Sequence, residues 1–454
     1  MVPKIDQQVS LVWFRKKHII LGALAVLLIA PPIGLTLAWM VFSEYIKPVL
    51  SSQFAFSMII MGLSLFLIIH LCAACILAER KLSAYIQDRQ GPNRVGWGGV
   101  LQPIADGLKF MLKEDIVPAN VEKPVFILAP CLAFIVALVG FAVIPWAGTI
   151  EWPWTNPNGT PAVVHTQVAQ VDIGVLYMLA VGAMSVYGVV LAGWASNNKY
   201  AHFGGMRAAA QMLSYEVPLG LGILILLISS GTLRLEEIVD QQAKSGVWNA
   251  FAHPIAFILV LITAFAETNR APFDLAECEQ ELVAGFHTEY SSMKFALFFL
   301  GEYAHMITNS ALMTVLFLGG WAILPGVTFL ADNNSWWAAL IKFNIVWGKI
   351  LGFVAFYMII RWTLPRFRFD QLMRLSWKGL VPLGMIMVLV TILMTAAGFR
   401  LQPEKGFAGN LVYLVVMFGV NAAVIGFTLW FNARTQNPIT GRQGNLPDVR
   451  VAPR

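Results

Sequence analysis

The chain has 454 residues, of which 58% are hydrophobic and 12% are charged, and its formal net charge is +6. Its mean hydropathy of +0.69 is typical of a polytopic membrane protein and excludes an ordinary soluble globular domain. Because the positive charge is small, the composition gives no argument for a nucleic-acid partner and we expect none, whereas a lipid bilayer is expected.

About ten apolar segments are long enough to cross a bilayer. They predict an all-α, polytopic transmembrane helix bundle with about nine or ten spans. The segment at 213–231 is the weakest, because it is short and contains Glu216 and Pro218. The first segment is longer than a signal-peptide core, so we expect a retained helix. The segments lie near 19–42, 54–78, 124–147, 172–195, 213–231, 248–267, 294–325, 338–361, 379–399 and 407–432.

The distribution of basic residues predicts the orientation of the chain. If the N-terminus is cytoplasmic, most of the 31 Lys and Arg residues fall in segments on the cytoplasmic side. Cytoplasmic loops of membrane proteins carry this bias, so we expect both termini in the cytoplasm. The same bias adequately explains the basic loop at 363–378. The segment at 148–171, on the opposite side, has no Lys or Arg and many turn-forming residues, and no chemistry is expected there.

The stretch from Ala266 to Tyr290 departs from this rule. It lies between two apolar segments on the predicted cytoplasmic side, yet Arg270 is its only basic residue before the next span. Carboxylates at the edge of a bilayer are costly, which makes their excess here informative. The six carboxylates are Glu267, Asp274, Glu277, Glu279, Glu281 and Glu289.

Helical geometry predicts which carboxylates of this acidic loop lie close together. Pro272 suits the first position of a short helix, on which Asp274, Glu277 and Glu281 would share one face while Glu279 points away. Like charges held close together raise one another's pKa, so some of these groups should titrate near neutrality. We interpret the loop as a proton-holding site beside a buried cavity. A solvated acidic turn is the alternative.

The segment at 78–115 is too long to be a simple turn. Its second half places apolar residues on one helical face, with Gln102, Asp106, Lys109 and Lys113 largely opposite. This pattern predicts an interfacial amphipathic helix on the cytoplasmic side, although an ordinary basic surface loop is an alternative. The preceding turn, GPNRVGWGG, can approach a partner closely. The apolar residues are Val100, Leu101, Ile104, Leu108, Met111 and Leu112.

Ionisable residues within spans usually face the interior of a bundle and serve ion pathways. Glu216, Glu267 and Glu302 are candidates of this kind. Glu302 and His305 lie three residues apart on one predicted helix, so they could share a proton. Asp172 lies at a helix start, where a capping role is equally compatible.

Lys342, Lys349, Cys72 and Cys75 are also located within predicted spans. Lys349 is deep and is expected to pair with a carboxylate, whereas Lys342 can extend to the surface. Cys72 and Cys75 form a C-x-x-C sequence without a second pair or a histidine at metal spacing, so we interpret them as packing residues. We expect no metal and no flavin in this chain.

Four stretches together resemble the H-type membrane subunit of bacterial NADH–quinone oxidoreductase and its counterpart, chain 1 of mitochondrial respiratory complex I. They cover roughly residues 55–400 in order. The departures are the added first helix, the loop at 148–171 and the residues past about 400. The stretches are AERKLSAYIQDRQGPNRVGWGGVLQPIADGLKFMLKED, LAGWASNNKYAHFGGMRAAAQMLSYEVPLG, AETNRAPFDLAECEQELVAGFHTEYSSMKFALFFLGEY and LPRFRFDQLMRLSWK.

The resemblance implies a core at 51–400 that forms the entrance and floor of a quinone cavity. An N-terminal extension with an extra transmembrane helix at 1–50 would precede it, and an additional helix and flexible tail at 401–454 would follow. The implied cavity residues are Glu79, Arg80, Asp106, Lys109, Arg270, Asp274, Glu277, Glu279, Glu281 and Glu289. The implied proton path contains Asp172, Glu216, Glu267, Glu302, His305 and Lys349.

The resemblance further implies that quinone, either ubiquinone or menaquinone, is the substrate and that the redox centres belong to other subunits. The implied partners are the peripheral-arm subunits at the quinone site and neighbouring small membrane subunits, in the cell inner membrane. A close alternative is the equivalent subunit of a membrane-bound hydrogenase or of a ferredoxin or F420H2 dehydrogenase. A stand-alone proton or cation transporter would explain the buried carboxylates but not the long cytoplasmic loops, and a purely structural scaffold is the remaining alternative.

Overall fold

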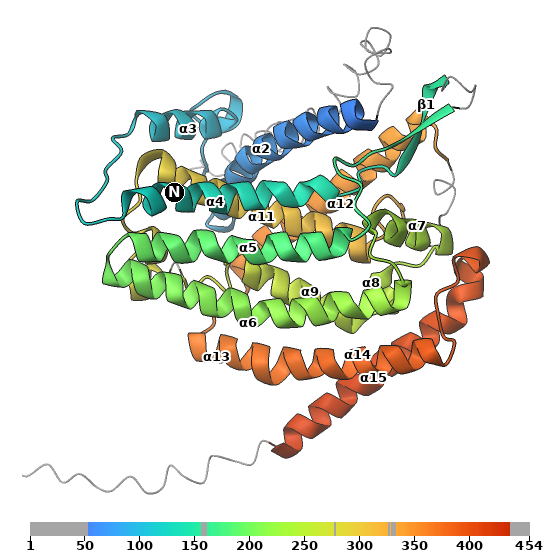
Figure 1. Cartoon of the computed structure of the whole chain (residues 1–454). Coiled ribbons are helices and arrows are strands. Elements are labelled where there is room, and N and C mark those ends of the chain that lie inside the picture. Colours follow the sequence, from blue (N-terminus) through green and yellow to red (C-terminus); the bar gives the residue numbers. More distant parts are fainter. Residues whose placement is uncertain (1–52, 156–160, 277, 326, 328–332, 436–454) are drawn as a thin grey trace, which may run out of the picture.

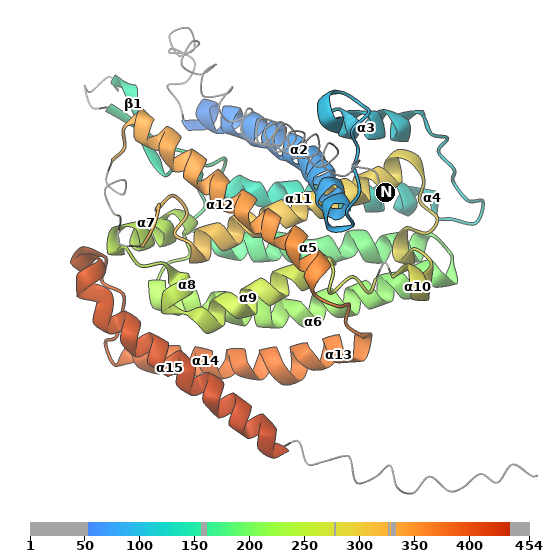
Figure 2. The same cartoon turned by 180° about the vertical axis from the view of Figure 1, so that it is seen from behind.

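The computed structural model describes residues 53–155, 161–276, 278–325, 327 and 333–435. The predicted first span at 19–42, the tail after 435 and Glu277 lie outside these residues. The described chain is a bundle of long helices, which confirms the all-α polytopic prediction (Figures 1 and 2). Its long helices are α2 (Gln53–Ile86), α4 (Lys123–Val139), α5 (Gly174–Ala195), α6 (Lys199–Ser230), α11 (Ser292–Phe317), α12 (Trp336–Thr363), α14 (Val381–Ala396) and α15 (Gly406–Thr435).

Shorter elements connect or extend these helices. The 3-10 helices are η1 (Trp97–Gly99), η2 (Gly140–Val143), η3 (Gly285–His287) and η5 (Pro403–Lys405), and η4 (Leu375–Leu380) is a π-helix. The shorter α-helices are α3 (Gln102–Leu112), α7 (Leu235–Ser245), α8 (Asn249–Ala252), α9 (Pro254–Glu267), α10 (Glu279–Leu282) and α13 (Phe369–Arg374).

Seven helices in the described ranges are long and apolar enough to cross a membrane, so the chain is a multi-pass membrane protein. Two predicted spans are helical but fall outside this set. The span at 248–267 is divided, because Pro254 starts the 14-residue α9 after the short α8. The span at 294–325 ends as a helix at Phe317, and polar residues such as Glu302 and His305 lower the hydropathy of α11.

The predicted weakest span belongs to one of the longest helices. α6 runs for 32 residues from Lys199 to Ser230 and continues through Pro218. Asn198 caps its start, because its side-chain oxygen accepts a hydrogen bond from the Tyr200 N–H at 2.9 Å. Gly231 ends it in the left-handed conformation, which glycine adopts without steric cost.

The segment at 148–171 contains a hairpin, which the sequence did not predict. Strands β1 (Thr149–Thr155) and β2 (Pro161–His165) are antiparallel, with Thr149 opposite His165. His165 Nδ1 donates to Glu236 of α7 at 3.0 Å, and this hydrogen bond raises the pKa of His165. The hairpin is therefore fixed to α7 at the end of the bundle where α5 begins.

A helix, α3 (Gln102–Leu112), lies where the amphipathic helix was predicted, next to the end of α2. Its apolar residues are exposed: Ile104 is 61% and Leu112 is 85% accessible in the isolated chain. The pattern of apolar residues on one face is therefore available to cover lipid or a partner. Its position in a membrane interface stays a prediction.

The core of the bundle is built around α9 and α11. Every residue of α11 from Met306 to Phe317 is buried, as expected for a helix enclosed on all sides. α5 and α6 lie on one side of this pair and α12 on the other, with α14 beside α6 (Figures 1 and 2). This central position determines where the polar residues of α9 and α11 can act.

Candidate functional site

Arg270, from the loop after α9, is the centre of a buried ionic cluster. Its NH1 contacts Glu79 Oε2 at 2.8 Å and its Nε contacts Glu302 Oε1 at 2.5 Å. The Tyr303 hydroxyl donates to Glu79 Oε2 at 2.5 Å, and the guanidinium of Arg270 lies 4.2 Å from the centre of the Tyr303 ring. Arg361 of α12 also pairs with Glu79. The cluster joins α2, the acidic loop, α11 and α12.

Balance of charge explains how these groups can be buried together. The Arg270 and Glu79 side chains are only 8% and 5% exposed, and buried ions are costly unless they are paired and hydrogen-bonded. Two arginines here meet two carboxylates. Removing one partner would leave an uncompensated charge, at a cost of about 3–5 kcal/mol.

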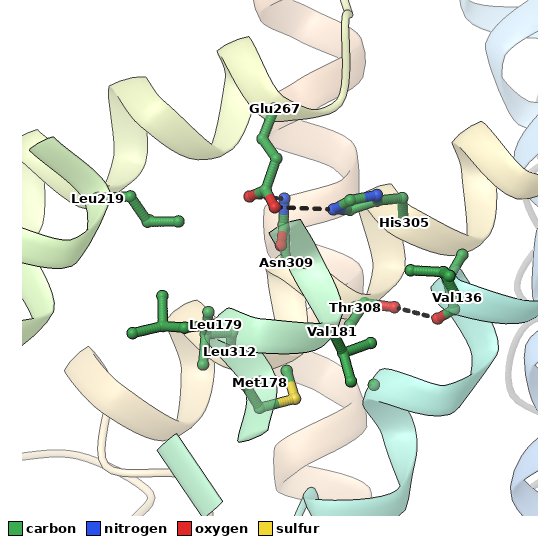
Figure 3. Close-up of a pocket in the computed structure, with 13 residues that line it drawn as sticks. Val136, Met178, Leu179, Val181, Leu219, Glu267, His305, Thr308, Asn309 and Leu312 are labelled. Atoms are coloured by element: carbon green, nitrogen blue, oxygen red, sulfur yellow. Dashed lines mark hydrogen bonds and ion pairs between the residues drawn. The ribbon is translucent and has the colours of Figure 1, made fainter. Parts of the chain in front are cut away.

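A second polar group surrounds Glu267, at the end of α9 (Figure 3). His305 Nε2 lies 3.4 Å from Glu267 Oε1, and Asn309 Nδ2 donates to Glu267 Oε2 at 3.2 Å. The sequence suggested that His305 could share a proton with Glu302. The structure corrects this pairing, because Arg270 binds Glu302 while His305 points toward Glu267.

Three small cavities meet at Glu267. Their volumes are about 60, 30 and 10 Å³. The first is also lined by Glu302 and His305, the second by His305 and Asn309 (Figure 3), and the third by Glu216. A water molecule needs about 10–15 Å³ and several polar partners. The larger two cavities therefore suit water, and the carboxylates provide its partners.

The acidic loop does not form the predicted helix. Within the described part of the predicted helix, only Glu279–Leu282 is α-helical, and Asp274 lies in irregular structure before it. Asp274 pairs with Arg366 at 3.0 Å, whereas Glu281 pairs with Arg207 at 2.5 Å. The prediction of one shared acidic face is therefore wrong for these two residues. Glu277 and the side chain of Glu279 lie outside the part of the chain that the structure describes.

Burial and side-chain hydrogen bonding override local helix signals in this loop. Phe273, Leu275 and Ala276 are buried, which draws the backbone into the protein. Gln211 of α6 replaces helical hydrogen bonds, because its Nε2 lies 2.8 Å from the carbonyl oxygens of both Ala266 and Phe273. A buried backbone carbonyl needs such a partner when no helix supplies one.

Several residues of the site escaped the sequence analysis. Gln211 gave no charge signal, and Arg361 lay at the end of the predicted span 338–361. Arg366 belonged to the basic loop at 363–378, which was attributed to membrane topology. Arg207 gave no signal either. The pairing of each arginine with a particular carboxylate depends on contacts between residues far apart in the chain.

Two further groups lie at the cytoplasmic end of the bundle as the sequence orients it. Arg80 NH1 contacts Asp106 Oδ2 at 2.5 Å and so joins α2 to α3. Lys109 lies over the ring of Phe110, 4.6 Å from its centre. Glu289 accepts a hydrogen bond from Asn198 Nδ2 at 2.5 Å. Arg80, Asp106 and Lys109 are thus separate from the buried cluster, although Arg80 follows Glu79 in the chain.

Two predicted path residues have other surroundings. Asp172 is 76% exposed and pairs with Arg234 beside the start of α5, away from the Glu267 cavities. Lys349 donates to the carbonyl oxygens of Leu318, Gly320 and Ala322 at 2.5–2.9 Å, where α11 ends. The expected pairing of Lys349 with a carboxylate is therefore wrong. Unsatisfied carbonyls at a helix end attract a cation more readily than a distant acid does.

Lys342 and the cysteines complete the comparison with prediction. Lys342 is 2% exposed, so it does not extend to the surface as expected. Cys72 and Cys75 are buried free thiols within α2, in agreement with a packing role. In the described residues, no three His, Cys, Asp or Glu side chains are grouped so that they could hold a metal ion.

Comparison with known proteins gives the family of the chain. The family model for NADH dehydrogenase matches residues 56–392. The H subunit of NADH-quinone oxidoreductase from Leptospira biflexa is 49% identical over 322 residues, which cover 70% of this chain and 89% of the relative. The H subunit from Flavobacterium psychrophilum is 47% identical over 317 residues (69% and 89%), and an H subunit from Geobacter sulfurreducens is 49% identical over 321 residues (69% and 87%). The chain therefore belongs to the NADH dehydrogenase family, among the bacterial H subunits of NADH-quinone oxidoreductase.

Proposed function

We propose that this protein forms the floor of a quinone chamber and couples quinone reduction to proton translocation. The observation that carries the proposal is a continuous series of partly buried acids. Glu302 lies in the ionic cluster beside the acidic loop, and it lines a cavity together with Glu267. Glu267 in turn lines a cavity with Glu216. Partly buried carboxylates that share small cavities can accept and pass protons.

The acidic loop would connect this series to the quinone. Reduction of a quinone to a quinol takes up protons, while electrons from NADH would reach it through redox centres in other subunits. Arg270 contacts both Glu79 and Glu302. Protonation of one of these carboxylates would therefore strengthen the ion pair between Arg270 and the other. A change in protonation near the quinone would therefore redistribute charge in the buried cluster.

From Glu302, water in the 60 Å³ cavity would carry the proton to Glu267, where His305 and Asn309 stabilise the carboxylate. The 10 Å³ cavity is narrow and leads to Glu216, which has no hydrogen-bond or ion-pair partner among the described residues. Glu216 would therefore be the group from which the proton passes on to a neighbouring membrane subunit.

The cytoplasmic loops would hold the peripheral arm. Residues 93–97 of the turn that precedes α3 are exposed, with Trp97 91% accessible. The exposed apolar face of α3 would border the quinone entrance with Arg80 and Asp106. The positive bias of these loops supports a location in the cell inner membrane with both termini cytoplasmic. The compared relatives are named as quinone oxidoreductase subunits, so we favour this function over that of a hydrogenase or F420H2 dehydrogenase component.

Charge-neutral substitutions test the acid series in the assembled complex. We expect Glu216→Gln and Glu267→Gln to lower NADH:quinone turnover by about tenfold or more, a loss of about 1.4 kcal/mol or more of transition-state stabilisation. Electron transfer from NADH to an artificial acceptor that bypasses the quinone should be unchanged. Glu151 in strand β1 is an exposed glutamate and provides a matched control. A complex with Glu151→Gln should pump protons normally. Full proton pumping in an assembled Glu216→Gln, Glu267→Gln double variant would overturn the proposal.

A further inference from the structure

A proline interrupts the hydrogen bonding of α6 two residues after Glu216. Pro218 has no N–H, so the carbonyl of Ser214, four residues earlier, loses its helical partner. In the lipid-embedded part of a protein, an unsatisfied backbone group costs several kcal/mol. α6 nevertheless continues as a helix to Ser230, so the freed carbonyl must be satisfied from elsewhere.

The missing donor comes from another helix. The Ser376 hydroxyl donates to the Ser214 carbonyl oxygen at 2.6 Å, and Ser376 is fully buried. The indole Nε1 of Trp377 donates to the Ser214 hydroxyl at 3.2 Å. Both donors belong to the π-helix η4, which precedes α14. Ser376 thus replaces the hydrogen bond that Pro218 removes.

A second hydrogen bond has its donor on α6 and its acceptor on the segment that contains the π-helix. The Tyr215 hydroxyl donates at 2.9 Å to the carbonyl oxygen of Leu372, which lies just before the π-helix. Tyr215 and Leu372 are both buried. Backbone hydrogen bonding is irregular in both helices at this point, and a side-chain hydroxyl of each helix binds a carbonyl of the other. π-helical turns occur often at functional sites.

Glu216 directly follows these two anchored residues of α6. Its carboxylate lines the cavity that it shares with Glu267, so its position depends on the course of α6 at Pro218. The π-helix follows α13, and a loop precedes α13. In this loop Arg366 pairs with Asp274, and the Phe367 N–H donates to the Pro272 carbonyl at 3.3 Å. The contacts therefore extend from the acidic loop to Glu216.

We propose that Pro218 and Ser376 are a matched pair of positioning residues that hold Glu216 at its cavity and connect it to the acidic loop. This inference rests on the proposed role of Glu216 in proton transfer. Neither residue handles a proton itself. Pro218 leaves the Ser214 carbonyl without its helical N–H donor, and the Ser376 hydroxyl takes the place of that donor. Ser376 belongs to the helical segment that follows the loop in contact with Asp274 and Pro272.

A double-mutant cycle in the assembled complex tests the pair. Ser376→Ala leaves the Ser214 carbonyl unsatisfied, so we expect NADH:quinone turnover per assembled complex to fall about tenfold, equivalent to about 1.4 kcal/mol, with a shift of the pH profile. Pro218→Ala restores the helical N–H. The Pro218→Ala, Ser376→Ala double variant should therefore recover turnover to within about twofold of wild type.

Controls separate positioning from general packing. Thr391 of α14 is also a buried hydroxyl, but it bonds within its own helix to Met387 O at 2.8 Å, so Thr391→Ala should leave the pH profile unchanged. Ser376→Thr retains a hydroxyl and should retain much of the turnover. If Ser376→Ala does not assemble, recovery of assembly and of the pH profile in the double variant supports the pair.

Two results would overturn the inference: an unshifted pH profile in assembled Ser376→Ala, or no recovery in the double variant. Failure of the proposed function is distinguishable, because it appears as full pumping in Glu216→Gln. A defective Glu216→Gln together with an unaffected Ser376→Ala would reject only the positioning role.

Discussion

Replacing Arg270 by methionine perturbs the ionic cluster unequally. Glu79 would keep Arg361 and the Tyr303 hydroxyl, whereas Glu302 would lose its contact with the Nε of Arg270. The Arg270 side chain is 8% exposed, so water would screen the remaining charge only weakly. We expect a destabilisation of about 3–5 kcal/mol, the range for breaking a buried ion pair by removing one partner.

The unequal effect gives a second-site test. Adding Glu302→Gln to Arg270→Met removes the uncompensated charge, so the double variant should recover a large part of the lost stability. Recovery by Glu79→Gln should be smaller, because this change leaves Glu302 unpaired. Thermal inactivation of the purified complex and its amount on native gels would measure stability, and quinone turnover would be read separately.

Stability and quinone turnover should respond differently in the double variant. Arg270→Met, Glu302→Gln would assemble but remain defective in quinone turnover, since the contact between the acidic loop and the acid series is lost. An Arg270→Met complex as stable as wild type would refute the reasoning about the buried cluster. Equal rescue by Glu79→Gln and Glu302→Gln would refute the inequality derived from the contacts.

Two other predictions concern regions outside the acid series. The raised pKa of His165, caused by its hydrogen bond to Glu236, means that the contact stabilises the hairpin fully below the unfolded pKa of about 6.5 and is lost as pH rises through the folded value. The protection of the backbone amides of residues 162–165 against hydrogen exchange, measured relative to their intrinsic exchange rates, should fall over that window in the wild type and stay constant in His165→Gln; wild-type protection that does not change with pH would contradict the assignment. Lys349→Met removes the donor for three carbonyls at the end of α11, so we expect a loss of about 1–3 kcal/mol in thermal stability. Lys349→Arg should restore most of it, and an equally large loss in both variants would argue against a role in capping.

The sequence determined the class of fold because hydropathy is a local property. An apolar run of sufficient length must be a helix in a bilayer, since only a helix satisfies its own backbone there. For this reason α2, α4, α5, α12 and α15 agree with their predicted segments. The excess of acids in the loop after α9 was likewise visible directly in the sequence, and the structure places Arg270 of this loop in the buried ionic cluster.

Tertiary structure decided which charges meet. Glu79 and Arg270 are 191 residues apart in the chain, and no local pattern connects them. Helical spacing suggested that His305 belongs with Glu302, but Arg270 occupies Glu302 and leaves His305 to Glu267. Pro272 suggested a helix in the acidic loop, yet Gln211 and the buried Phe273 hold this backbone in another conformation. Local propensity is worth only tenths of a kcal/mol per residue, so the cost of about 3–5 kcal/mol for leaving a buried charge without its partner outweighs it.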